Sequence, residues 1–272
     1  QIAPIDVQYQ SAPLLKRMLT NFAGPMNNFI LGIAVFIAIA FVQGGVTVNE
    51  SRLGEIQPDS PAEAAGVREN DEVLAVNGDA TADWTELVTS IQANPGNQIT
   101  LTVVTDGEEA RDVLVTPDTK TDEQGNEYGL IGVAVPMDRT LMAKISYGFK
   151  EFWVIATSIF GLVFAMFRTG FQADSFGGPV AIYAATEQVV DYGFLSVLSF
   201  LAYLSINLGV VNLLPIPALD GGKLLLNLVE GIRGKPLDPE KEGIITAIGM
   251  GLLLLLMVIV TWNDIQRFFF GQ

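Results

Sequence analysis

The stretch SINLGVVNLLPIPALDGGK, residues 205–223, decides the fold prediction, because a long uncharged run ends within it at a carboxylate. Residues 192–219 carry no charge, and Asp220 follows them directly. Pro215 and Pro217 break a helix just before Asp220, since proline lacks an N–H and clashes with the preceding turn. Broken backbone at membrane depth persists only inside protein or beside a watery cavity. We therefore predict a site at the end of a membrane helix.

The residues around Asp220 favour a site over a simple interface anchor. A lone aspartate at a membrane helix end more often marks the water boundary, and the alternatives are a metal ligand, a proton relay or an ion site. Gly221 and Gly222 allow a close turn that presents the carboxylate. Asn212 supplies an amide that could bind an extended backbone. This gathering of polar atoms at a helix break indicates a binding or catalytic role.

The composition places the chain in the membrane class and excludes several functions. Of 272 residues, 50% are hydrophobic and only 17% are charged, which is typical of a membrane protein. Most acidic residues of this chain, whose net charge is −15, lie between Glu50 and Asp138, so we expect a water-exposed domain there. An acidic domain repels phosphate backbones, which argues against nucleic acid as a partner. The absence of cysteine excludes disulfides and thiolate metal sites.

Four uncharged stretches are candidate membrane segments, namely residues 18–49, 152–167, 192–219 and 243–263. A helix needs about 20 residues to cross the hydrocarbon core, and residues 152–167 fall short of that length. Basic residues mark cytoplasmic loops. With three spans the basic residues at both ends lie inside the cell: Lys16, Arg17, Lys223, Arg233, Lys235 and Lys241. We therefore predict three spans and an interfacial helix over residues 141–168.

The acidic segment contains the pattern of a small α+β domain. Ser60 and Pro61 predict the start of a short helix that ends at Gly66. A hairpin, a longer helix and a second hairpin are then predicted over residues 72–78, 83–93 and 98–116. This order, together with SPAEAAGVRENDEVLAVNG, resembles a circularly permuted PDZ domain of the type found in bacterial proteases. The alternative is another small α+β module.

Three sequence blocks resemble the site-2 protease family of intramembrane metalloproteases (M50 type). Residues 212–222, NLLPIPALDGG, match the family signature N-x-x-P-x-P-x-L-D-G. Residues 23–29, AGPMNNF, are similar to the family's A-G-P-x-x-N-F block, and residues 176–182, FGGPVAI, to its G-P-x-x-I segment. One PDZ domain between residues 23–29 and residues 176–182 is similar to Gram-positive members of the sigma-factor-regulating branch.

The resemblance implies one zinc ion per full-length protein, with Asp220 as its third protein ligand. The family supplies the other two ligands from the histidines of an H-E-x-x-H helix, whose glutamate is the general base. This chain has no histidine, so no catalytic residue is expected in it. We expect the chain to begin just after that helix; the alternative is a natural pseudoprotease. The residues expected to support the motif or bind substrate are Asn212, Pro215, Pro217, Leu219, Gly221 and Gly222.

The predicted function is that of an intramembrane zinc endopeptidase which cuts single-span membrane proteins such as anti-sigma factors, or remnant signal peptides. The alternative is a non-catalytic, membrane-anchored PDZ adaptor. A transporter is disfavoured, because the spans contain no second charged residue and the chain shows no inverted repeat. We expect the PDZ domain to act as a size filter rather than to capture peptides. Its predicted groove consists of Arg52, Leu53, Gly54, Glu55 and Ile56.

The fold class predicted is a polytopic α-helical membrane protein with an inserted α+β PDZ domain. We expect it in the bacterial cytoplasmic membrane, with the PDZ domain outside the cell and Asp220 near the cytoplasmic side. The predicted order is a connecting region with a possible β-hairpin (1–20), a transmembrane helix (21–46), the PDZ domain (47–118), a β-rich connection (119–140), the interfacial helix (141–168), a connecting loop (169–191), a transmembrane helix (192–219), a cytoplasmic loop (223–242) and a transmembrane helix (243–263).

Overall fold

The chain forms two compact units, which we describe separately. A computed structural model describes residues 12–122, 124–170 and 177–270. The helical unit consists of Gln1–Val42 together with Ile145–Gln272, and the inserted unit of Gln43–Lys144. Along the sequence, the inserted unit thus separates the two parts of the helical unit.

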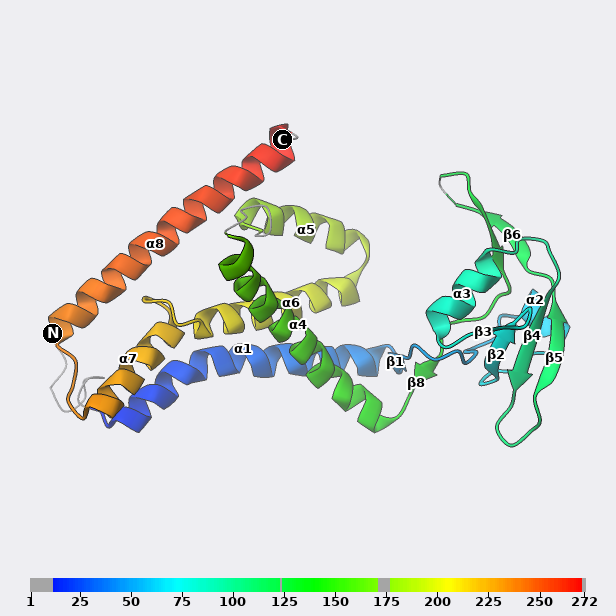
Figure 1. Cartoon of the computed structure of the whole chain (residues 1–272), viewed down its shortest axis with the longest axis horizontal. Coiled ribbons are helices and arrows are strands. Elements are labelled where there is room, and N and C mark those ends of the chain that lie inside the picture. The colour runs from blue at the N-terminus through cyan, green and yellow to red at the C-terminus, as the bar shows by residue number, and fades with distance from the viewer. Residues whose placement is uncertain (1–11, 123, 171–176, 271–272) are drawn as a thin grey trace. The chain divides into compact units, whose positions relative to one another are not determined.

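The helical unit contains long helices with short connections (Figure 1). α1 packs along α6 and α7, and α5 contacts both α6 and α8. The elements are α1 (Leu14–Val42), α4 (Leu141–Thr169), α5 (Pro179–Asp191), α6 (Phe194–Leu213), α7 (Asp220–Arg233), α8 (Pro239–Ile265) and the π-helix η4 (Gln266–Phe270).

Small residues let α1 and α6 approach closely. A Cβ atom at Gly32 would lie 2.5 Å from Ile206, and one at Gly209 would lie 2.5 Å from the Phe29 ring. Phe29 also meets Phe152 of α4 edge to face, with ring centroids 5.1 Å apart. Such contacts are typical of helix pairs in membranes, where small residues let two helices approach closely enough for van der Waals packing.

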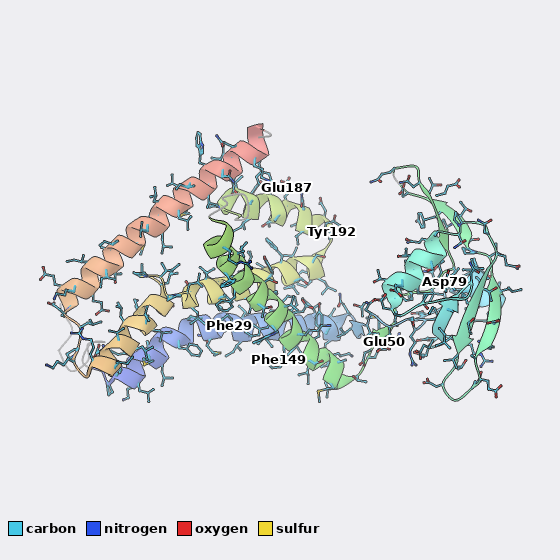
Figure 2. All side chains as sticks on the ribbon, in the orientation of Figure 1. Phe29, Glu50, Asp79, Phe149, Glu187 and Tyr192 are labelled. Carbon is cyan, nitrogen blue, oxygen red and sulfur yellow. The ribbon has the colours of Figure 1, made fainter. Side chains whose placement is uncertain are left out.

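Many apolar side chains of the helical unit point outward, as Figure 2 shows for the labelled Phe149 and Tyr192. Along α8, Leu252, Leu255 and Val258 are each more than half exposed. Three helices among the described residues are long and apolar enough to cross a membrane: Leu14–Val42, Phe194–Leu213 and Pro239–Phe268. These three correspond to the three predicted spans.

The inserted unit is built on a four-stranded antiparallel sheet in the order β3-β2-β4-β5. Two small two-stranded sheets, β1-β8 and β6-β7, accompany it. Its helices are α2 (Pro61–Ala65) and α3 (Trp84–Gln92), and its strands are β1 (Val46–Thr47), β2 (Glu72–Val76), β3 (Asp79–Ala80), β4 (Ile99–Val104), β5 (Arg111–Val115), β6 (Asp118–Thr121), β7 (Glu127–Leu130) and β8 (Met137–Asp138).

Local signals in the sequence determine both helices of the inserted unit. The Ser60 hydroxyl accepts a hydrogen bond from the Glu63 N–H at 3.2 Å, and α2 ends at Gly66 in the left-handed conformation. Asp83 caps α3 in the same way through the Glu86 N–H at 2.9 Å. The two predicted helices and the predicted hairpin strands are therefore confirmed within one or two residues.

Several predicted boundaries in the helical unit were wrong. Residues 223–242 are not a loop, because α7 occupies most of them and α8 already begins at Pro239. The predicted connecting loop 169–191 contains α5, and the predicted helix 192–219 ends at Leu213. The stretch was predicted to be a loop because it lies between two uncharged spans, but the apolar residues between Leu224 and Ile232 let α7 form.

Part of two other predictions lies outside the described residues. The predicted hairpin 1–20 includes residues 1–11, which are not described, while residues 14–20 are the first turns of α1. Phe176 of the predicted G-P-x-x-I block is also not described, and the remainder of that block opens α5 at Pro179.

Candidate functional site

The predicted motif forms the connection between α6 and α7, and Asp220 is the first residue of α7. Asn212 lies in the last turn of α6, Pro215 and Pro217 lie in the connection, and Leu219 occupies the N-cap position. The residues predicted at this motif thus lie at the end of α6, in the connection and at the start of α7. A carboxylate in the first turn of a helix is stabilised by the helix dipole.

A tight turn reverses the chain immediately before Asp220. The Leu219 N–H donates to the Ile216 carbonyl at 3.1 Å, which closes a β-turn with Pro217 and Ala218 at its centre. Ala218 has φ of 83°, which is the left-handed region that a type II turn requires at this position. A residue with a Cβ atom is strained there, and the strain is of order 1–2 kcal/mol.

Gly221 and Gly222 are required by the close approach of the connection. A Cβ atom at Gly221 would lie 2.2 Å from the Leu213 carbonyl oxygen, and one at Gly222 would lie 2.2 Å from that of Ile216. Both neighbours are backbone atoms, so the contact cannot be relieved by a side-chain rotation. These glycines therefore let the first turn of α7 pack directly on the connection that precedes it.

Two other helices hold the motif from outside. A Cβ atom at Gly249 of α8 would lie 2.3 Å from the Pro217 carbonyl oxygen. A Cβ atom at Gly24 of α1 would lie 3.2 Å from the Asp220 Oδ2 atom. Gly24 belongs to the predicted A-G-P block, and its missing side chain leaves space directly beside the carboxylate. Sequence reasoning did not assign a role to Gly249.

The connection between α6 and α7 offers one functional group for chemistry, the half-buried carboxylate of Asp220. A carboxylate oxygen can serve as one ligand of a metal ion. Among the residues that the structure describes, no group of three His, Cys, Asp or Glu side chains could hold a metal ion. Asp220 alone therefore offers one ligand, and a complete metal site needs others.

The predicted groove residues of the inserted unit are already hydrogen-bonded within it. Leu53 is fully buried in the core, and its N–H donates to the Asp71 carbonyl at 2.8 Å. The Gly54 N–H donates to the Ala134 carbonyl at 3.1 Å, and the Glu55 carbonyl accepts from the Ala134 N–H at 2.9 Å. A peptide strand added here would have to displace these bonds. The groove assignment stays a prediction.

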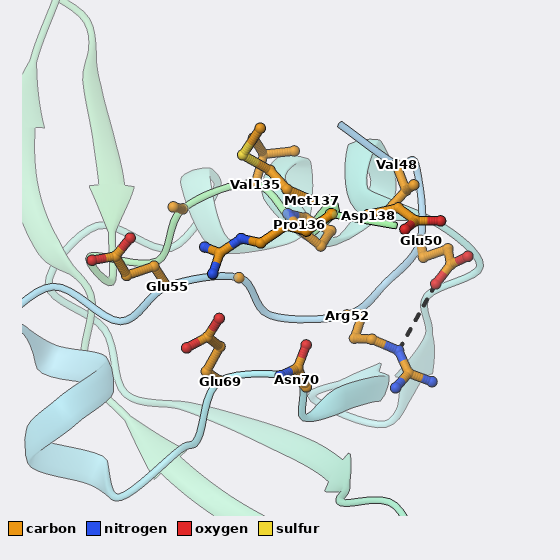
Figure 3. A pocket seen from close by; sticks show the side chains of 13 residues that line it. Val48, Glu50, Arg52, Glu55, Glu69, Asn70, Val135, Pro136, Met137 and Asp138 are labelled. Carbon is orange, nitrogen blue, oxygen red and sulfur yellow. Dashed lines mark ion pairs between the residues drawn. The ribbon is translucent and has the colours of Figure 1, made fainter. Parts of the chain in front are cut away.

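Beside this segment lies a cavity of about 290 Å³ (Figure 3). Arg52, Gly54 and Glu55 of the predicted groove line it, together with Glu69 and Asp138. Hydrogen bonds from the N–H and hydroxyl of Thr140 lower the pKa of Asp138 below its usual value. The cavity wall therefore carries both signs of charge, with carboxylates in excess among these residues.

An ion pair between α1 and α7 was missed at the sequence level. Arg17, which we interpreted as a topology marker, donates from Nη1 to Glu230 Oε2 at 3.2 Å and also pairs with Oε1. The available signal was Glu230 itself, because it is a single acid within the apolar run of α7. A carboxylate there needs a partner if that face is buried.

A second carboxylate, Asp264 of α8, was also missed. It is only 3% exposed, and its Oδ2 atom accepts a hydrogen bond from the Ala181 N–H at 3.0 Å. Gly178, the N-cap residue of α5, provides no side-chain cap of its own. Asp264 therefore caps α5 from a different helix, which ties the predicted G-P-x-x-I block to α8.

Comparisons with known proteins agree with the family resemblance. The "Probable protease eep" of Enterococcus faecalis is 48% identical over 99% of this chain and 64% of its own length. "Zinc metalloprotease RasP" of Geobacillus kaustophilus is 44% identical over 99% and 63%, and that of Oceanobacillus iheyensis is 42% identical over 99% and 64%. The chain thus spans just under two thirds of the length of these relatives.

Among solved structures, the PDZ domain of an SdrC-like protein from Listeria monocytogenes is 19% identical over 33% of this chain and 90% of that chain. Its TM-score of 0.27 is too low to support an argument about the fold.

The family described as "Peptidase family M50" matches residues 3–256 of this chain. Because this match runs through most of the chain, the chain belongs to peptidase family M50.

Proposed function

We propose that the protein containing this chain is an intramembrane zinc endopeptidase, and that Asp220 is one of its zinc ligands. The observation that carries the proposal is the presentation of Asp220 at the start of α7, in a connection packed against α1 and α8. Membership of family M50 and the zinc metalloproteases among its relatives support the same activity. The proposed substrates are single-span membrane proteins such as anti-sigma factors, and remnant signal peptides.

The donor set of this chain suits one position of a catalytic zinc site. Catalytic zinc has three protein ligands and an open position, and aspartate is an accepted ligand. The two histidines and the glutamate base would come from an H-E-x-x-H helix outside these residues. Bound zinc would polarise the scissile carbonyl and lower the pKa of its water.

The residues of this chain would hold the carboxylate and receive the substrate. The turn at Pro217 and Ala218, together with Gly221 and Gly222, fixes the direction in which Asp220 leaves the backbone. The proposed role of the Asn212 amide is to bind the backbone of an unwound substrate. The N–H and C=O groups of such a substrate are no longer hydrogen-bonded within a helix. Positioning of this kind lowers the barrier to the chemical step.

The proposed membrane arrangement places α1, α6 and α8 across the bilayer, with α4 as an interfacial helix. The outward apolar side chains of these helices support a lipid environment. Lys16, Lys223 and Arg233 are exposed and flank the predicted cytoplasmic ends. Arg17 adds little to this count, because Glu230 neutralises it. Asp220 then lies near the cytoplasmic side and the inserted unit outside the cell.

The inserted unit is proposed to be a PDZ domain that acts as a size filter for substrates. Its element order supports the domain type, and the closed backbone bonding of the predicted groove favours exclusion over strand addition. A substrate with a bulky folded ectodomain should be cut more slowly than the same substrate after removal of that ectodomain. Equal cleavage rates for both would contradict the filter.

The test of the catalytic proposal is cleavage of a single-span substrate by the whole protein in reconstituted vesicles. Asp220→Ala should lower the rate at least about a hundredfold, since even indirect partners of metal ligands typically contribute 10–100-fold. Asp191→Ala is the matched control, because it removes an exposed carboxylate at the end of α5. Wild-type turnover by Asp220→Ala would overturn the assignment.

A further inference from the structure

We propose that the buried ion pair of Arg17 and Glu230 sets the register of α7 against α1 and thereby positions Asp220. The register claim stands on geometry alone, and its consequence for catalysis rests on the proposed function. Both residues belong to the helical unit and lie far apart in sequence. They are positioning residues, because they would act on Asp220 through α7 rather than by touching substrate or metal.

The pair is bidentate and largely shielded from water. Nη1 of Arg17 donates to Oε2 of Glu230 at 3.2 Å, and Nη2 pairs with Oε1. The two side chains are only 11% and 15% exposed. A two-pronged contact between guanidinium and carboxylate fixes both groups in orientation as well as in distance.

The pair belongs to a polar seam between α1 and α7. On α1 the spacing of Leu14, Arg17, Asn21 and Gly24 keeps these residues on one face. On α7 the corresponding face contains Asp220, Asn227 and Gly231, and Glu230 borders it. Counted as whole residues, Arg17, Asn21 and Asn227 are 9%, 7% and 6% exposed.

The opposite side of α7 is apolar and open. Leu225, Leu228 and Ile232 are 44%, 50% and 79% exposed. α7 is therefore inverted relative to a helix on the surface of a water-soluble protein, which turns its apolar face inward. An apolar outer face gives little preference for one register in lipid, so we assign the register to the charged pair on the inner face.

The ion pair favours one register because a slip takes the shielded Glu230 carboxylate away from the guanidinium that it pairs with. Sliding α7 by one turn moves Glu230 about 5.4 Å along the axis, beyond the reach of a direct contact with Arg17. Charges buried without partners are strongly destabilising, and fixing a register is the best-attested role of buried polar pairs. Oppositely charged residues on facing helices therefore select the observed alignment.

In the observed register the side-chain-free position of α1 faces the proposed metal ligand. A Cβ atom at Gly24 would lie 3.2 Å from Asp220 Oδ2, while at the other end of the seam one at Gly231 would lie 3.0 Å from Leu14 Cδ2. Ten residues separate Asp220 from Glu230, which is about 15 Å along a rigid helix. A displacement at the pair is transmitted along α7 to Asp220.

Crosslinking in the whole protein reports the register directly. The described chain has no cysteine, and any cysteine elsewhere in the protein is replaced by serine. Leu14→Cys with Gly231→Cys reports the observed register, because these positions are in contact. Met18→Cys with Gly231→Cys reports a shift of one turn. A short bifunctional thiol reagent is used without substrate and after removal of metal by a chelator.

Removing one charge should change the crosslinking pattern. With Glu230→Gln, the yield of the 14–231 crosslink should fall at least about tenfold and that of the 18–231 crosslink should rise, because the charged contact between α1 and α7 is lost. Reversing the pair with Arg17→Glu and Glu230→Arg should restore the 14–231 crosslink. Asn227→Leu is the matched control, since it removes a buried polar group from the same seam and should leave the pattern unchanged.

Two results would overturn the register claim. One is a 14–231 crosslink that is unaffected by Glu230→Gln, and the other is a loss with Asn227→Leu as large as that with Glu230→Gln. If Glu230→Gln does not fold, the reversed pair decides: recovery of the crosslink supports the claim, and failure to recover it contradicts the claim.

Kinetics then test the link to Asp220. Glu230→Gln should lower kcat about tenfold or more with KM nearly unchanged, because a misplaced ligand affects the transition state rather than substrate binding. The reversed pair should recover kcat. A register shift without any change in kcat would refute the positioning of Asp220 but not the register claim, and an inactive wild-type protein would refute the proposed function instead.

Discussion

The two units of this chain place polar and apolar side chains in opposite ways. The inserted unit buries an apolar core of Leu53, Val73, Leu87 and Leu101, and its charged residues lie mostly outside. The helical unit turns apolar residues outward along α7 and α8, whereas Arg17, Asn227 and Asp264 are buried. The difference is that expected between a unit folded in water and one folded in lipid.

The two units are also stabilised by different kinds of contact. In the inserted unit, stability comes from burying side chains of substantial volume, so truncating one leaves a cavity. In the helical unit, the motif is held by backbone contacts at Gly221, Gly222 and Gly249, so adding a methyl group is the damaging change. The candidate site lies in the unit of the second kind.

The largest effect on stability is expected from truncating the core of the inserted unit. Leu101→Ala in isolated residues 43–144 should lower the free energy of unfolding by about 2–5 kcal/mol, because Leu101 is fully buried. Leu114→Ala on the neighbouring strand is the control, since Leu114 is 59% exposed. Denaturant unfolding measures both. Equal losses would show that residues 43–144 have no core of their own.

A smaller but more specific effect is expected from adding a methyl group to α8. Gly249→Ala should cost about 1–3 kcal/mol through overpacking and should reduce cleavage, because its Cβ would lie 2.3 Å from the Pro217 carbonyl oxygen. Gly251→Ala, two residues further along, meets no atom within 4 Å and should be tolerated. Thermal unfolding in detergent and a cleavage assay compare the two. Identical behaviour would place α8 away from the motif.

The smallest effect is expected at the turn before Asp220. Ala218→Gly removes the strain of a left-handed residue, which is of order 1–2 kcal/mol, and adds about 0.5–1 kcal/mol of unfolded-chain entropy. A net stabilisation of about 1 kcal/mol or less should raise Tm slightly, with cleavage retained. Ala218→Val should lower Tm, because a branched residue fits this conformation poorly. A lower Tm for Ala218→Gly would contradict the turn geometry.

Much of the inserted unit was predictable from the sequence because its signals are local. Ser60 and Asp83 cap their helices through neighbouring N–H groups, and alternating residues mark β4 and β5. Such signals depend on residues only a few positions apart. The predicted strands and helices therefore agree closely with the structure.

The helical unit was less predictable because its decisive contacts join distant residues. The sequence indicated Asp220 and the two glycines after it, but not that Gly24 and Gly249 pack around them. It also offered no means of pairing Arg17 with Glu230 across more than two hundred positions. Residues 223–242 were interpreted as the loop between two uncharged spans, which concealed α7.

The most direct test of the central claim is the zinc affinity of the whole protein, measured by competition with a chelating dye. Asp220→Ala should weaken zinc binding at least about a hundredfold, whereas Asp191→Ala should leave it unchanged. Circular dichroism of both variants shows whether the fold is retained. An Asp220→Ala protein that keeps its fold and binds zinc as tightly as wild type would contradict the account.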